Sequence, residues 1–114
     1  MPTEIRHIIF ANDEIIRAVV EYHKRTANPL PAGSVVRSAP EKYEDQIRLV
    51  LQIDIDSGMR QTLIIEEATF AAALIFFCMQ NKIPLPATAA KSLQFVGEQV
   101  ALRVTKESGR KDRR

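Results

Sequence analysis

Apolar residues recur along this chain with two different spacings, and these spacings predict its strands and helices. The strictest alternation runs over 47–55, where every second residue is Ile or Leu, and this is typical of a strand with one buried face. Together with the turn residues Asp56-Ser57-Gly58, it predicts a β-hairpin over 47–65. Residues 40–44 lack a regular pattern, so we expect a loop there. Shorter apolar or alternating runs predict further strands at 5–10, 33–38, 61–65, 92–96 and 100–104.

A spacing of three to four residues predicts a first helix after the strand at 5–10. Ile15 and Val19 lie on its apolar face, and charged residues occupy the opposite face. Asn12 and Asp13 are favourable N-cap residues and are expected to begin the helix. Pro29 cannot continue a helix and restricts the residue before it, so the helix should end there.

A second helix is predicted between Glu66 and Pro84, and it is apolar on nearly every side. Glu66 and Glu67 place negative charge at its N-terminus, where the helix dipole favours it. Residues 70–79 contain no charged side chain. We expect such a helix to be covered on more than one side. Either it is central, between the sheet and the first helix, or one side meets a partner.

The chain contains an apparent internal repeat. Pro-Leu-Pro-Ala at 29–32 recurs 55 residues later at 84–87. At the same offset Ile9 also coincides with Ile64, and Ala18 with Ala73. Similarity at a fixed period indicates duplicated units, here 3–57 and 58–105. Coincidence is the alternative, because many helices end at proline.

The predicted elements follow the order strand, helix, strand, strand, and then repeat it. The expected fold class is α+β, with two βαββ-like halves containing about six mainly antiparallel strands and two helices. We expect a single domain over 1–105, followed by a basic flexible tail at 106–114.

Composition and charge narrow the functional classes. The chain has 46% hydrophobic and 26% charged residues, as an ordinary globular domain does. Its net charge of +2 comes from the tail: without 106–114, 11 of the 16 basic and 12 of the 14 acidic residues remain. This balance argues against a dedicated nucleic-acid-binding domain. The tail alone would supply only nonspecific affinity for phosphate groups.

The sequence also indicates in which cellular compartment the protein is expected. Cys78 is its single cysteine, so no internal disulfide can form. Residues 1–7 lack the apolar core of a signal peptide, and the uncharged stretch 68–81 is too short to cross a bilayer. We therefore expect a cytoplasmic protein that does not cross a membrane.

Residues whose side chains could bind a metal or act in catalysis are present, but they are scattered along the sequence. His7 falls in a strand and His23 at the edge of a helical stripe, and neither has a second ligand at metal-binding spacing. Cys78 lies in the most apolar helix, which favours a packing role over a nucleophilic one. Glu66 and Glu67 are explained by their position at a helix N-terminus. Structural or surface roles are expected for all five residues.

A calcium loop is only superficially suggested by 54–58. Gly58 is fifth rather than sixth in that segment, and Ile65 occupies the position of the bidentate glutamate. The aspartates fit a solvated strand face and a turn instead. The sequence thus predicts no catalytic, cofactor-binding or metal-binding residue.

One short pattern resembles a known group of proteins. Ile83-Pro84-Leu85-Pro86, followed by Lys91-Ser92-Leu93, is similar to segments of small conserved bacterial proteins without an assigned activity. The resemblance implies no substrate, cofactor or catalytic residue.

These observations favour a non-enzymatic protein-interaction or regulatory module, which works by contact with another protein. Phe76 and Phe77 on the apolar helix are its predicted interaction surface, and a homodimer is one way to cover them. The alternative is a small-molecule-binding protein or enzyme with a cleft between the two halves. A metal-dependent version is disfavoured, because His7 has Thr62 as its repeat counterpart and threonine is not a typical metal ligand.

Overall fold

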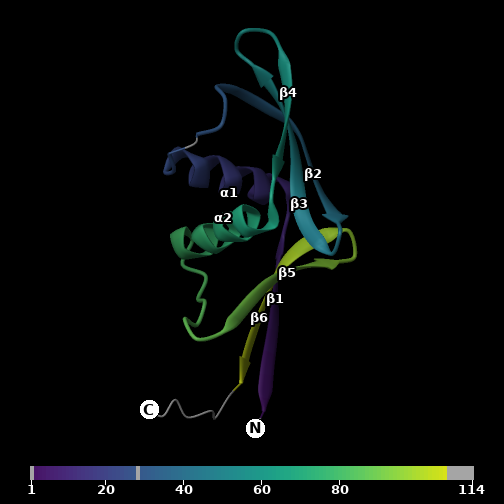
Figure 1. Cartoon of the computed structure of the whole chain (residues 1–114). Helices are drawn as coiled ribbons and strands as arrows, with labels where there is room; N and C mark the ends of the chain where they lie inside the picture. Colours follow the sequence, from purple (N-terminus) through teal and green to yellow (C-terminus); the bar gives the residue numbers. More distant parts are fainter. Residues whose placement is uncertain (1, 28, 108–114) are drawn as a thin grey trace.

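The computed structural model describes residues 2–27 and 29–107. Within them the order strand, helix, strand, strand occurs twice (Figure 1). The first half consists of β1 (Thr3–Phe10), α1 (Asn12–Lys24), β2 (Gly33–Tyr43) and β3 (Gln46–Ile55). The second half consists of β4 (Arg60–Ile65), α2 (Glu67–Gln80), β5 (Ala90–Val96) and β6 (Gln99–Glu107). The predicted α+β class with two βαββ-like halves is confirmed.

The strands of the described part form two antiparallel three-stranded sheets, with the orders β1-β6-β5 and β2-β3-β4. Each sheet combines the hairpin of one half with the first strand of the other half. The registers of the two sheets differ: Ile8 pairs with Leu102, whereas its repeat counterpart Leu63 pairs with Leu51 and not with Ile47, the counterpart of Leu102. Neither half completes a three-stranded sheet from its own strands.

Both sheets and both helices share one core. The sheets lie one above the other along the long axis, with α1 and α2 beside each other on the same side (Figure 1). Strand β3 buries the alternating residues predicted from the sequence, Ile47, Leu49, Leu51 and Ile53. The other sheet and the helices contribute Val100, Leu102, Val104, Ile15, Ala18, Val19, Phe70, Ala73, Leu74 and Cys78.

Burial follows the repeat as well. At the offset of 55 residues the buried pairs include Phe10 and Ile65, Ile15 and Phe70, Ala18 and Ala73, Val19 and Leu74, and His23 and Cys78. The exposed residues Ile9 and Ile64 correspond too, with 45% and 46% of their surface accessible. The two halves are therefore packed alike. Their origin by duplication stays a prediction.

The position of α2 explains why it is apolar on nearly every side. It packs against α1, and it contacts β3 of one sheet and β5 and β6 of the other. At its first turn, the Glu67 carboxylate accepts a hydrogen bond from the backbone N–H of Ile47 at 2.5 Å. At the last turn this cover ends, and Met79 is 67% exposed. Other parts of the chain thus cover α2 from several sides.

The start of α1 differs from the prediction, because the N-cap residue is Ala11 rather than Asn12 or Asp13. The Ala11 carbonyl accepts hydrogen bonds from the backbone N–H groups of Glu14 and Ile15. Alanine has no side-chain cap, and Glu14 compensates: its carboxylate accepts a hydrogen bond from the Ala11 N–H at 2.8 Å. This hydrogen bond is the reciprocal half of a capping box. The prediction was wrong because it relied on the usual preference for Asn and Asp at the N-cap position.

The loop predicted at 40–44 is also wrong, because β2 continues to Tyr43 and pairs with β3 throughout this segment. Pro40 is tolerated because β2 is an edge strand, where one side of the backbone has no partner strand. The turn is Glu44-Asp45, with φ of 50° and 68°. Tight hairpin turns of this kind require positive φ at both residues and are usually marked by Asn-Gly or Asp-Gly. Glu-Asp does not match that signal.

Strand β6 reaches into the segment expected to be a tail. Lys106 pairs with Glu4, and Glu107 pairs with Thr3. The rest of the predicted tail, 108–114, lies outside the described residues.

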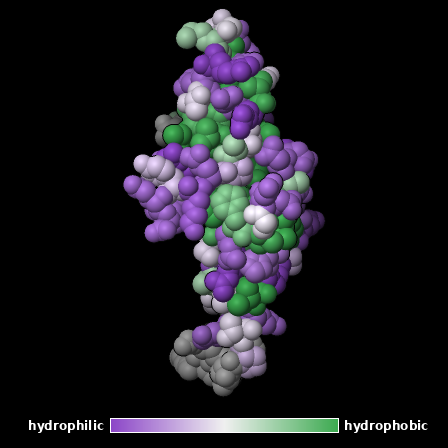
Figure 2. All heavy atoms as spheres, turned by 90° about the vertical axis from the view of Figure 1, so that its right-hand side faces the viewer, coloured by the Kyte–Doolittle hydropathy of each residue, from purple (hydrophilic) through white to green (hydrophobic). Residues whose placement is uncertain are grey.

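The sheet faces that point away from the helices are mixed in polarity. Figure 2 shows apolar patches on this side, separated by polar side chains. Ile5 of β1 is 48% exposed, comparable with Ile9 and Ile64. The main apolar surface of each sheet thus faces the helices.

Because Ala73 is fully buried, a larger side chain at this position should destabilise the protein. Ala73→Leu inserts a branched side chain into a packed core, which costs about 1–3 kcal/mol of unfolding free energy. Urea denaturation followed by circular dichroism measures this cost. The matched control is Ala68→Leu at an exposed position of the same helix, expected within about 0.5 kcal/mol of the original protein. Equal effects of both variants would contradict the packing of α2.

Candidate functional site

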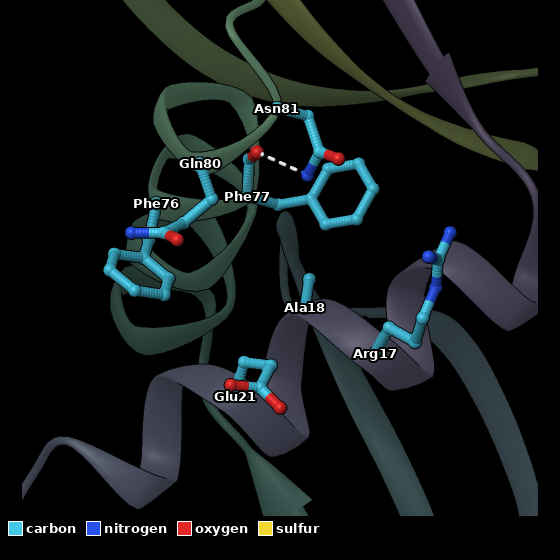
Figure 3. A pocket seen from close by; sticks show the side chains of 7 residues that line it. All are labelled: Arg17, Ala18, Glu21, Phe76, Phe77, Gln80 and Asn81. Atoms are coloured by element: carbon cyan, nitrogen blue, oxygen red, sulfur yellow. Dashed lines mark hydrogen bonds between the residues drawn. The ribbon is translucent and has the colours of Figure 1, made fainter.

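A groove between α1 and α2 is the principal candidate site. It is open to solvent and has a volume of about 250 Å³. Its lining residues are Arg17, Ala18 and Glu21 of α1 together with Phe76, Phe77, Gln80 and Asn81 at the end of α2 (Figure 3). The groove therefore contains both phenylalanines singled out in the sequence.

Phe77 is held between a second ring and a cation. Its ring meets that of Phe10 edge-on, with 5.9 Å between the ring centroids. The Arg17 guanidinium lies 5.6 Å from the Phe77 centroid. A cation–π contact at an exposed site contributes about 0.5–1 kcal/mol. This contact keeps the positive charge of Arg17 beside the apolar ring.

Phe76 has the same kind of surroundings. Its ring meets Tyr22 edge-on at 6.1 Å, and the Arg25 guanidinium lies 5.3 Å from its centroid. Arg17 belongs to α1, and Arg25 directly follows Lys24, the last residue of that helix. Between them in the sequence, Ala18 is too small to fill the space beside the phenylalanines.

The rim of the groove carries more positive than negative charge. Glu21 is the acidic residue in the lining, and it pairs with Lys24 at 3.3 Å. The helices run in the same direction, so their C-terminal ends lie together: Lys24 ends α1, Arg25 follows it, and Lys82 follows α2 (Figure 1). Cations are favoured there because helix C-termini carry partial negative charge.

Asn81 ends α2 and shapes one side of the groove. Its Nδ2 donates a hydrogen bond to the Phe77 carbonyl at 2.9 Å, and its backbone N–H donates to the same oxygen (Figure 3). The groove thus offers aromatic rings, a guanidinium, a carboxylate and side-chain amides. These groups are suited to noncovalent recognition.

The structure does not bring the histidines and the cysteine together in one site. His23 is buried, and its Nδ1–H donates a hydrogen bond to the Val19 carbonyl at 2.9 Å, which gives it a structural role. His7 is exposed on β1. Cys78 is buried in α2, where burial raises the pKa of its thiol and the positive charge of Arg6 partly opposes this rise.

The acidic candidates are engaged locally. Hydrogen bonds from Arg60, at 2.6 and 3.2 Å, lower the pKa of Asp54. Glu66 is the N-cap residue of α2, and Glu67 binds the backbone of β3. Among residues 2–27 and 29–107, no three His, Cys, Asp or Glu side chains are grouped so that they could hold a metal ion.

A second hollow, of about 310 Å³, lies between the two halves. It is lined by the first hairpin, by the start of α2 and by β5, through Lys42, Asp45, Ile47, Glu67, Leu93, Gln94 and Phe95. No motif marks these residues in the sequence. Lys42 and Asp45 reach this place because β2 runs five residues past the predicted strand end at Ser38, to Tyr43.

Comparison with known proteins gives no match: no family model fits the chain, and no curated protein or solved structure is significantly similar to it. In the described part of the chain, neither α1 nor α2 has the length and apolarity that spanning a bilayer requires. The function therefore has to be argued from the geometry.

The environment of Cys78 predicts an unreactive thiol. Burial shields the sulfur and disfavours the thiolate, so a disulfide reagent should react at least about a hundredfold more slowly with folded protein than with protein in guanidinium chloride. Absorbance of the released thiol measures both rates. As a control, a Cys78→Ala/Ser57→Cys double variant carries its thiol in the exposed turn before β4 and should react rapidly while folded. Rapid reaction of folded Cys78 would contradict its burial.

Proposed function

We propose that this protein is a non-enzymatic interaction module, that its docking site is the groove between α1 and α2, and that its partner is an apolar, acidic segment of another protein. The proposal rests mainly on one observation. Phe77 is paired with Arg17 of α1 and Phe76 with Arg25 directly after that helix, on a surface that is open to solvent.

The apolar part of the partner follows from the two rings. Both phenylalanines line the groove and are only partly buried. Aromatic residues, methionine and arginine are enriched in the cores of protein interfaces, and aromatic residues with arginine dominate their binding energy. An apolar side chain of the partner would exclude water from these rings.

The acidic part follows from the charges around the groove. Arg17 and Arg25 flank the rings, and Lys82 follows α2 at the same end. The guanidinium of Arg17 offers a forked set of donors that fits a carboxylate. Acidic residues beside the apolar side chain would therefore add specificity and speed association.

The same charges make a second copy a poorer occupant of the groove. Two copies joined through this face would bring Arg17, Arg25 and Lys82 of one chain near those of the other. Like charges across an interface cost free energy. Cover of α2 within the chain also removes the main reason to expect a homodimer.

Charge reversal in the groove tests the proposal. Peptides selected from a random phage-displayed library against the whole protein should combine Leu, Phe, Trp or Met with Asp or Glu. Arg17→Glu should weaken their binding about tenfold or more, because it removes a charge-assisted hydrogen bond and adds repulsion. Fluorescence anisotropy of the labelled peptides measures the affinities.

Lys106→Glu is the matched control, since it makes the same charge change at an exposed position of β6. It should leave the affinity unchanged, and thermal unfolding should verify that both variants are folded. Peptides without acidic residues, or peptides that bind the Arg17→Glu variant as well as the original protein, would contradict an acidic partner.

The homodimer prediction has a separate test. If the groove face joins two copies, Phe76→Glu or Phe77→Glu should halve the mass measured by sedimentation equilibrium, because each buries an unpaired charge in the contact. Folded variants of unchanged mass would exclude a dimer through this face.

A further inference from the structure

We infer that the cleft between the two halves is a binding site for a small zwitterion with an apolar group, of the α-amino acid class. This inference does not depend on the groove between α1 and α2, because the two sites share no lining residue.

The size of the cleft fits a small ligand. Its volume of about 310 Å³ lies at the lower end of the range of ligand pockets, which is about 300–1,000 Å³. The cleft is formed by three separate elements, the β2–β3 hairpin, the start of α2 and β5. Its shape therefore depends on how the two halves are packed together.

Two opposite charges in the cleft lack a partner. Lys42 and Asp45 are exposed, and neither has an ion pair or a side-chain hydrogen bond with another residue of the described part. Lys42 lies near the end of β2, and Asp45 lies in the turn that follows it. A ligand with a carboxylate and an ammonium group could pair with both, its carboxylate with Lys42 and its ammonium with Asp45.

Glu67 supplies a third polar group, and its position is fixed. Its Oε1 accepts the hydrogen bond from the Ile47 N–H, which ties the side chain to β3. The other carboxylate oxygen can accept a hydrogen bond from the ligand ammonium. Two carboxylates and one ammonium in the lining thus match a ligand that carries both charges.

The remaining lining is largely apolar. Ile47 is buried, and Leu93 and Phe95 of β5 are partly buried. These side chains would contact an apolar group on the ligand. Polar groups that fix orientation beside apolar walls are typical of small-molecule sites.

The equivalent place in the other half lacks these features. The hollow there has a volume of about 80 Å³, and no lysine or arginine is among the described residues that line it. In this smaller hollow, Asn12 is the repeat counterpart of Glu67, and Pro40 is the counterpart of Phe95. The larger cleft is therefore not a simple by-product of the repeated fold.

The test titrates the isotopically labelled full chain with L-leucine and follows backbone amide signals by nuclear magnetic resonance. Leucine should shift the signals of residues 42–47 and 93–95. Leucinamide lacks the carboxylate, and N-acetyl-leucine lacks the ammonium group. Each should bind at least about tenfold more weakly than leucine, because each loses a charge-assisted hydrogen bond. Glycine, without the apolar group, should also bind more weakly.

Single substitutions then assign each charge. Lys42→Gln should weaken leucine binding about tenfold and remove the preference for leucine over leucinamide. Asp45→Asn should remove the preference for leucine over N-acetyl-leucine, and asparagine tolerates the positive φ at this turn. The controls Lys106→Gln and Asp56→Asn make the same changes at exposed positions outside the cleft.

The inference would be overturned by no signal shifts at millimolar leucine, by equal binding of leucine and leucinamide, or by shifts confined to the groove between α1 and α2. Unaltered affinity in both Lys42→Gln and Asp45→Asn would do the same. None of these results affects the peptide-binding proposal, whose variants lie in the other site.

Discussion

Each sheet is completed by a strand from the other half, and the whole core depends on this exchange. The central strands β3 and β6 carry the most deeply buried apolar residues, and each lies between a strand of its own half and one of the other. Neither half could cover its apolar strand face alone. Because the halves are joined in this way, α1 and α2 pack side by side over one common core. The groove and the cleft both form where the two halves meet.

Local patterns in the sequence predicted most elements but not how they combine. Alternation over 47–55 identified β3, and the Asp56-Ser57-Gly58 turn placed the hairpin that follows. The exchange of strands between the halves depends on contacts between residues far apart in the sequence. The spacing of apolar residues within one segment therefore cannot predict it. The errors at Ala11 and at 40–44 have a different cause. In both places a less common arrangement, a Glu14 side chain as cap and a Glu-Asp turn, replaced the residues that usually signal the structure.

The candidate sites show a similar division. Phe76 and Phe77 stood out because α2 has more apolar residues than one buried face requires, and both line the groove. Their arginine partners come from α1 and from the residue directly after it, so only the packing of the two helices brings them together. The cleft was missed altogether. Lys42 and Asp45 fell within or beside a segment interpreted as a loop, and Phe95 is distant from them in the sequence.

The pairing of β1 with β6 has a consequence for the order of the chain. Thr3 lies opposite Glu107, much as Asp54 lies opposite Arg60 where a short turn joins β3 to β4. The eight described elements thus form an almost closed ring, in which the break between β6 and β1 corresponds to that turn. A circular permutant, with β6 connected to β1 and new ends opened at Ser57, would contain the same pairs of strands with its halves in reverse order. The architecture is in this sense defined by a cyclic order of elements rather than by a linear one.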